Sequence, residues 1–68
     1  MRVMVEYHGK STYLQGGSVL GYSEDMFKGL SIRLDRGAFM AAQARLECPL
    51  NHSPRVYVEG KKTSYTVE

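Results

Sequence analysis

Of the 68 residues, only one is a cysteine and only two are histidines. The single Cys48 excludes a disulfide bond within the chain. Structural zinc requires four ligands, and His8 and His52 lie far apart in the sequence, so a metal site is poorly supported. A chain of this length buries only about 60% of the surface that its unfolded form exposes. Because small domains without disulfides or metals are usually stabilised by association, we expect a homo-oligomer.

Catalytic signatures are equally scarce. Glu24 and Asp25 are the only acidic residues next to each other in the sequence, and their side chains diverge on an extended chain. No carboxylate pair is therefore placed for general acid and base catalysis. Cys48 and His52 could form a nucleophile and its base, but no third group accompanies them. We therefore expect a protein that is not an enzyme, with a buried structural thiol at Cys48 and a loop histidine at position 52.

Long apolar runs are also missing. No stretch approaches the roughly 20 apolar residues of a membrane span, and the N-terminal segment lacks the apolar centre of a signal peptide. Nine Lys and Arg residues stand against seven Asp and Glu residues, which gives a net charge of +2. This balance permits an anionic partner without requiring one. We expect a soluble, cytoplasmic protein that has no membrane partner.

The sequence does contain short segments in which apolar and polar residues alternate. This alternation, typical of half-buried strands, occurs at residues 2–7, 11–14, 18–23, 30–35, 55–59 and 63–67. Residues 8–10, 15–17 and 60–61 are predicted turns, and the two prolines of residues 49–54 indicate a loop. The chain is therefore predicted to be all-β, a small antiparallel β-sandwich formed by one domain of residues 1–68.

The stretch from Leu30 to Cys48 is predicted to form a central hairpin. Its first strand ends at Asp35, and Gly37 can adopt the positive φ that closes a short turn. Residues 38–47 contain strong helix formers, but their alternation of apolar and outward-facing residues favours a second strand. If residues 38–47 formed a helix, the predicted hairpin would be wrong, and most of the interpretation that depends on it would be wrong too.

Basic and aromatic residues are interspersed around this predicted hairpin and near the end of the chain. The arginines Arg33 and Arg36 occupy predicted outward positions, and Lys61 lies in the last turn. Phe27 and Tyr57 could stack on exposed bases. The alternatives are an ordinary solvated surface and, for Phe27, a place in the core or in a subunit contact.

Several separated segments resemble the tryptophan-activated RNA-binding attenuation protein family of Gram-positive bacteria. Val19-Leu-Gly-Tyr-Ser23 is similar to that family's V-I-G-L-T strand, and Arg33-Leu-Asp-Arg-Gly37 is similar to its K-L-D-K-G turn. Ala41-Ala-Gln43 resembles I-A-Q. His52-Ser53, followed by Val56-Tyr-Val-Glu-Gly60, resembles H-T followed by I-K-V-R-G. The matches occur in the same order across residues 19–61.

This resemblance implies a β-sandwich whose sheets join between neighbouring subunits into a closed ring, which would remove exposed sheet edges. It also implies a small effector, tryptophan, bound between subunits, and no other cofactor. The residues that match the ligand-binding positions of the family are Ser23, Gln43, His52 and Ser53. Their hydroxyl, amide and imidazole groups suit the ammonium and carboxylate of an amino acid.

The resemblance further implies that single-stranded RNA wraps the outside of the ring. Arg33 matches the turn lysine of the family, and Tyr57 stands where a late strand supplies a lysine. With the neighbouring cations and the exposed aromatic residue, the predicted RNA-binding residues are Phe27, Arg33, Arg36, Tyr57 and Lys61. The expected function is a ring-forming RNA-binding regulatory protein that a small ligand such as tryptophan controls.

Two other interpretations remain open. Residues 21–25 with residues 29–33 resemble the D-x-S-x-x-G strand of the PilZ domain, which binds cyclic di-GMP, although the R-x-x-x-R arm of that family is absent. A third interpretation is a ring without either ligand that has a structural or protein-binding role. The native mass and the binding of a cyclic dinucleotide distinguish these three interpretations.

Overall fold

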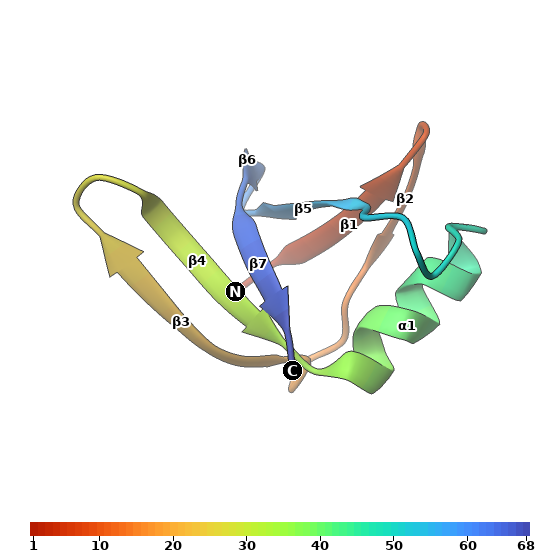
Figure 1. Ribbon diagram of the computed structural model, residues 1–68, viewed down its shortest axis with the longest axis horizontal. Helices are drawn as coiled ribbons and strands as arrows, with labels where there is room; N and C mark the ends of the chain where they lie inside the picture. The colour runs from red at the N-terminus through yellow and green to blue at the C-terminus, as the bar shows by residue number, and fades with distance from the viewer.

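A computed structural model describes all 68 residues and divides them between two sheets and one helix (Figure 1). Sheet A has the strand order β2-β1-β5-β6, and sheet B has the order β3-β4-β7. The helix α1 spans Arg36–Arg45. The strands are β1 (Val3–Tyr7), β2 (Lys10–Tyr13), β3 (Val19–Asp25), β4 (Gly29–Leu34), β5 (Arg55–Val58), β6 (Lys61–Lys62) and β7 (Ser64–Val67).

The core lies where α1 and β4 meet one face of sheet A. In Figure 1, sheet A and α1 occupy the right side, whereas the hairpin of β3 and β4 extends to the left. Ten buried side chains form the core, namely Val3, Val5, Ile32, Leu34, Phe39, Ala42, Leu46, Cys48, Val56 and Val58. Toward the far end of the β3–β4 hairpin, Leu30 is partly buried and packs against this core.

The predicted strands in the first part of the chain are confirmed within a few residues. In β1, Val3 and Val5 are buried, whereas Met4 and Glu6 alternate with them, as the sequence pattern predicts. The turn after β1 is also confirmed, with His8 and Gly9 both at positive φ. The chain is mostly β, as expected.

The prediction of a second strand over residues 38–47 is wrong, because residues 38–45 lie in α1 and residues 46–47 form the turn after it. Asp35 has extended backbone angles, φ −65° and ψ 130°, and its Oδ2 accepts a hydrogen bond from the backbone nitrogen of Ala38 at 3.0 Å. This is the geometry of a helix N-cap, not of a hairpin turn. Gly37 is accordingly a helical residue and does not have a positive φ.

The face of α1 that packs on the core explains why a helix forms here. Its buried residues recur with the spacing i, i+3, i+4 and i+7, which places Phe39, Ala42, Gln43 and Leu46 on one side. The high helix propensity of alanine, glutamine and arginine favours a helix as well, so propensity and packing agree here. The predicted central hairpin of residues 30–48 is therefore a strand followed by a helix.

The expectation of purely antiparallel sheets is also wrong for one strand pair. Strand β7 pairs in parallel with β4, and Ser31 is opposite Ser64. Because the segment after β4 forms α1 and not a neighbouring strand, the second edge of β4 stays open, and β7 occupies it. The chain turns at Gly60 from β5 into β6 and then crosses from sheet A to sheet B after Thr63.

We expect the substitution Asp35→Ala to lower the free energy of unfolding by about 1 kcal/mol, because it removes the N-cap acceptor of α1. Urea denaturation followed by circular dichroism measures this change. Asp35→Asn is the matched control, since asparagine caps helices about as well as aspartate. Equal stability of the alanine variant and the wild type would contradict the assignment of this cap.

Candidate nucleic-acid interface

One row of side chains crosses the outer face of sheet A, opposite the core. The strand register pairs Met4 with Tyr13 on one side and with Tyr57 on the other, and it pairs Tyr57 with Lys62. Directly paired residues of antiparallel strands point to the same face. Tyr13, Met4, Tyr57 and Lys62 therefore form a continuous row across the four strands, which we call the tyrosine row.

Arg2 extends the tyrosine row at the start of β1. The guanidinium carbon of Arg2 lies 4.6 Å from the centre of the Tyr13 ring, and its Nη2 donates a hydrogen bond to the Tyr13 hydroxyl at 3.2 Å. This cation–π contact holds the ring of Tyr13 in place while half of the residue stays exposed. A flat aromatic surface with a fixed positive charge results.

The two tyrosines flank a hollow of about 330 Å³. Its lining residues are Arg2, Met4, Tyr13, Tyr57, Glu59 and Gly60. Because the two tyrosines stand on strands that are two apart, strand spacing separates them by about 9–10 Å, with Met4 between them. The hollow is therefore apolar at its centre and aromatic at its sides, and its volume is at the lower end of the range for small-molecule pockets.

Two cations at this end of sheet A have no carboxylate partner: Lys61 and Lys62, which follow the turn at Gly60. The only ion pairs in the chain lie elsewhere, between Lys10 and Glu47 and between Arg33 and Glu68. The nearby acid Glu59 accepts a hydrogen bond from the backbone nitrogen of Arg2 at 2.7 Å. The unpaired cations are thus available to an external anion.

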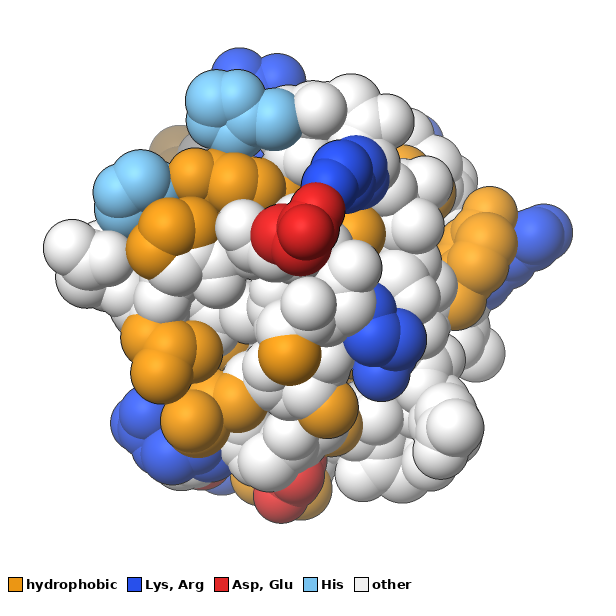
Figure 2. Space-filling model, turned by 90° about the vertical axis from the view of Figure 1, so that its right-hand side faces the viewer, with side chains coloured by type: hydrophobic (Ala, Val, Ile, Leu, Met, Phe, Trp, Pro, Cys, Tyr) orange, Lys and Arg blue, Asp and Glu red, His pale blue; other side chains and the backbone are white.

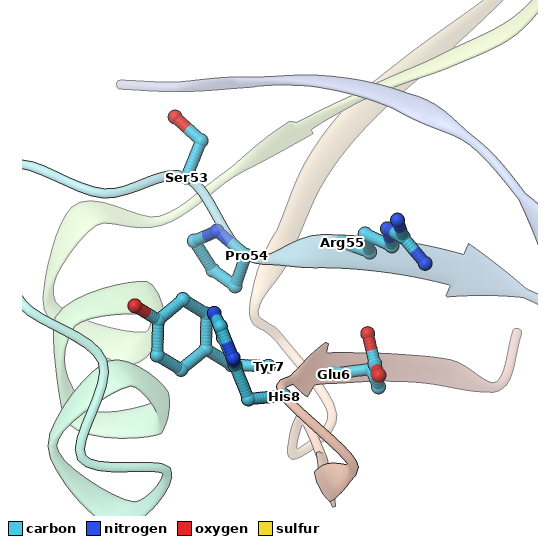
Figure 3. Close-up of a pocket in the computed structure, with 6 residues that line it drawn as sticks. All are labelled: Glu6, Tyr7, His8, Ser53, Pro54 and Arg55. Carbon is cyan, nitrogen blue, oxygen red and sulfur yellow. The ribbon is translucent and has the colours of Figure 1, made fainter.

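A second hollow, also of about 330 Å³, lies where β1 ends and β5 begins. Figure 3 shows Glu6 and Arg55 projecting from neighbouring strands on the same side, with the rings of Tyr7 and His8 next to Pro54. The register places Glu6 opposite Arg55. Arg55, the one Lys or Arg that lines this second hollow, therefore has an acid directly opposite it on the neighbouring strand.

Three of the four predicted ligand-binding residues line a single cleft. Gln43, His52 and Ser53 meet there in a volume of about 290 Å³ between α1, the loop before β5, and β7. The remaining lining residues are Arg36, Phe39, Met40, Leu50, Tyr65 and Val67. Figure 2 faces the side that carries α1 and shows hydrophobic side chains gathered beside the two histidines. The fourth predicted residue, Ser23, lies in β3 and does not line this cleft.

Gln43 fixes the wall of this cleft. Its Nε2 donates hydrogen bonds to the carbonyl oxygens of Pro49 at 3.2 Å and of His52 at 3.1 Å. The side chain of His52 is held from the other side, because its Nδ1 is hydrogen-bonded to the Tyr7 hydroxyl at 2.5 Å. Gln43 therefore positions the loop, and its amide nitrogen is already occupied.

Arg36 and Tyr65 supply the polar groups at the other side of the cleft. Arg36 has no carboxylate partner, and its Nη2 donates only a long hydrogen bond to the carbonyl oxygen of Val67, at 3.4 Å. Burial raises the pKa of Tyr65, and its hydroxyl donates to the carbonyl oxygen of Pro54 at 2.8 Å. The unpaired guanidinium above an apolar lining suits the carboxylate of a small apolar molecule.

The predicted RNA-binding residues are divided between three places. Tyr57 and Lys61 lie in sheet A, at the tyrosine row and next to it. Arg33 lies in β4 and donates a hydrogen bond to Glu68 at 3.2 Å, whereas Phe27 lies in the turn of the β3–β4 hairpin and is 93% exposed. Arg36 lines the cleft beside α1. Of the five, only Tyr57 and Lys61 place an aromatic residue and a cation on neighbouring strands of one sheet.

Sequence reasoning missed Arg2, Met4 and Tyr13 as interface residues. The outward position of Met4 follows from the alternation of β1, but its neighbours across the sheet depend on the pairing of β1 with β2 and β5. The turn at His8 and Gly9 sets the first of these registers. An analysis of that hairpin register would have placed Tyr13 beside Met4.

Comparisons of the chain with models of known protein families, with curated proteins and with solved structures find no match. The helix α1 is not long and apolar enough to cross a membrane. No group of three or more His, Cys, Asp and Glu side chains is arranged to hold a metal ion.

Proposed function

We propose that the chain binds single-stranded RNA on the outer face of sheet A. The observation that carries the proposal is the tyrosine row, in which two tyrosines flank Met4 and a cation lies at each end. Aromatic side chains on an open sheet stack on unpaired bases, and this is an established way to hold single-stranded RNA. Lysine and arginine beside the rings neutralise the backbone phosphates.

The aromatic character of the surface favours a single strand over a duplex. In a duplex the base faces are stacked on one another, so that the exposed ring of Tyr13 and the partly buried ring of Tyr57 would find no partner. Stacking also tolerates any base, because every base has a π face. We therefore expect modest sequence preference and strong salt dependence.

We expect RNA binding to weaken with salt at a slope of about −2 in log K against log [salt], because three cations each contribute about −0.7 on a single strand. These cations are Arg2, Lys61 and Lys62. Fluorescence anisotropy with a labelled G-rich repeat RNA measures the slope. Lys62→Ala should reduce its magnitude by about 0.7, whereas the control Lys28→Ala, in the turn of the β3–β4 hairpin, should leave it unchanged. Absence of salt-sensitive binding would refute the proposal.

The cleft beside α1 supports a second function, the binding of a small apolar carboxylate that regulates RNA binding. The observation in its favour is the unpaired Arg36 above an apolar lining. Tryptophan is the first compound to test, because the sequence resembles that of a tryptophan-regulated family. Native mass spectrometry with free amino acids reports the stoichiometry, and the anisotropy assay with and without tryptophan reports regulation. A lack of amino-acid binding in both assays would exclude this function.

The closed ring that the resemblance implies is a separate proposal. RNA binding by the tyrosine row does not require it, since all its residues lie on one subunit. A monomer that binds cyclic di-GMP would instead favour the alternative that resembles the PilZ domain. A protein with neither RNA nor ligand binding would favour the structural role.

A further inference from the structure

We propose that the Tyr7 hydroxyl holds His52 in the tautomer that carries its proton on Nε2, and that this N–H group and Arg36 together bind the carboxylate of a ligand in the cleft beside α1. The inference rests on the second proposed function, the binding of a small apolar carboxylate. His52 contacts the ligand in this arrangement. Tyr7 acts through His52 and is a positioning residue.

The Tyr7 hydroxyl is the donor of its hydrogen bond to His52. Its oxygen lies 2.5 Å from Nδ1 of His52, and the hydroxyl has no other hydrogen-bond partner in the chain. The unprotonated nitrogen of an imidazole is a better acceptor than a phenol oxygen, whose lone pair is delocalised into the ring. Since the hydrogen bond at one ring nitrogen decides which nitrogen carries the proton, neutral His52 has its proton on Nε2.

The ring of Tyr7 is fixed before any ligand arrives. Tyr7 ends β1 and packs against the core, and the ring of His8 lies edge-on to it with 4.3 Å between the ring centres. In Figure 3 the Tyr7 hydroxyl points away from Glu6 and Arg55, toward the side on which α1 lies. A rigid strand therefore presents the hydroxyl to the loop before β5.

The backbone around His52 is held as well. Its nitrogen donates a hydrogen bond to the carbonyl oxygen of Pro49 at 2.9 Å, and its carbonyl oxygen accepts one from Nε2 of Gln43 at 3.1 Å. Tyr7 occupies Nδ1. Of the polar groups of His52, only Nε2 has no partner within the chain, so this N–H group is left for an external acceptor.

Nε2 of His52 lies on the cleft side of the ring. His52 lines the cleft of about 290 Å³, whereas Tyr7 does not. The two nitrogens of an imidazole point away from each other across the ring, so Nε2 is directed away from Tyr7 when Nδ1 faces it. Arg36 lines the same cleft and has no carboxylate partner.

These two donors suit a carboxylate more than other anions. A carboxylate has two oxygens and can accept from the guanidinium and from the imidazole at the same time. Arg36 supplies one positive charge, which matches a monoanion. The apolar lining, formed by Phe39, Met40 and Leu50, disfavours a strongly hydrated dianion such as phosphate.

The tautomer is tested on the whole chain without ligand, by long-range proton–nitrogen correlation spectra of isotopically labelled protein at a pH at which the imidazole is neutral. We expect a protonated Nε2 and an unprotonated Nδ1 for His52. Tyr7→Phe keeps the ring and removes the hydroxyl, and it should give a mixture of both tautomers. Tyr22→Phe is the matched control, because the Tyr22 hydroxyl is exposed and has no partner in the chain. His52→Asn identifies the signals of His52.

The ligand contact is tested by isothermal titration calorimetry with indole-3-propionate, its amide and tryptophan. We expect both carboxylates to bind more tightly than the amide. His52→Asn leaves an acceptor for Tyr7 but no group at the position of Nε2, and it should weaken binding of the carboxylates by about tenfold or more. His52→Gln places its amide nitrogen near that position and should retain most of the affinity.

A wild-type spectrum with the proton on Nδ1 of His52 would overturn the proposal, and so would a spectrum that Tyr7→Phe leaves unchanged. Equal binding of the carboxylates by the wild type and His52→Asn would remove His52 from the site. If neither carboxylate bound at about 1 mM, the second proposed function and the ligand contact would both fail. The spectrum of the free chain would still decide the tautomer, so the two failures are distinguishable.

Discussion

Replacing both Tyr13 and Tyr57 with alanine is expected to weaken the binding of single-stranded RNA by about 30-fold or more. Each base that stacks on an aromatic side chain contributes about 1–3 kcal/mol, so each single substitution should cost about 5- to 150-fold. Tyr13→Ala also releases the guanidinium of Arg2, which loses its ring and its hydroxyl acceptor. Fluorescence anisotropy at fixed salt measures both losses.

Two controls separate stacking from other effects of these substitutions. Tyr13→Phe and Tyr57→Phe keep the aromatic faces and should retain most of the affinity. Phe27→Ala removes the most exposed aromatic residue of the β3–β4 hairpin, which the sequence predicted as an RNA contact. Affinity that falls with Phe27→Ala but not with the tyrosine variants would move the RNA site from sheet A to the hairpin.

Gln43→Ala is expected to destabilise the protein by about 2–5 kcal/mol. Gln43 is 3% exposed, and its Nε2 serves the carbonyl oxygens of both Pro49 and His52. Its removal leaves two carbonyl groups of the loop without this donor. Because a core in a chain this small rarely supplies more than about 3–5 kcal/mol, the variant should be close to unfolding at 25 °C. Urea denaturation measures the loss.

The matched control is Gln15→Ala, at an exposed glutamine whose side chain makes no hydrogen bond within the chain. It should change the stability by less than about 0.5 kcal/mol. If both glutamine variants were equally stable, Gln43 would not anchor the loop. Its predicted role as a direct ligand contact would then regain support.

The segment of residues 38–47 illustrates why periodicity alone can mislead. Alanines at 38, 41, 42 and 44 fit an apolar row with a period of two as well as a helical stripe, because alanine is tolerated on either side. The decisive signals were the N-cap at Asp35 and the helical spacing of Phe39 and Leu46. Gln43 hid this stripe, because a polar residue on the buried face interrupts the apolar pattern from which a helix is predicted.

The strands and the interface could be predicted to different degrees. The alternation of β1 and β5 fixed which of their residues face outward, and Tyr57 was accordingly chosen from the sequence as a stacking residue. Tyr13 and Arg2 were missed, because their positions depend on which strands pair and in which register. The parallel partner of β4 could not be predicted while the segment after β4 was taken for a strand.

The parallel pair of β4 and β7 has a consequence for the time course of folding. β4 pairs with β3 through a short turn, but its other neighbour, β7, begins at Ser64, far along the chain from the end of β4 at Leu34. Non-local pairing of this kind slows folding, because chain entropy is lost before the contact forms. We therefore expect the β3–β4 hairpin and α1 to form early and β7 to dock last. Until then, one edge of β4 remains open, and this intermediate is the stage most exposed to aggregation.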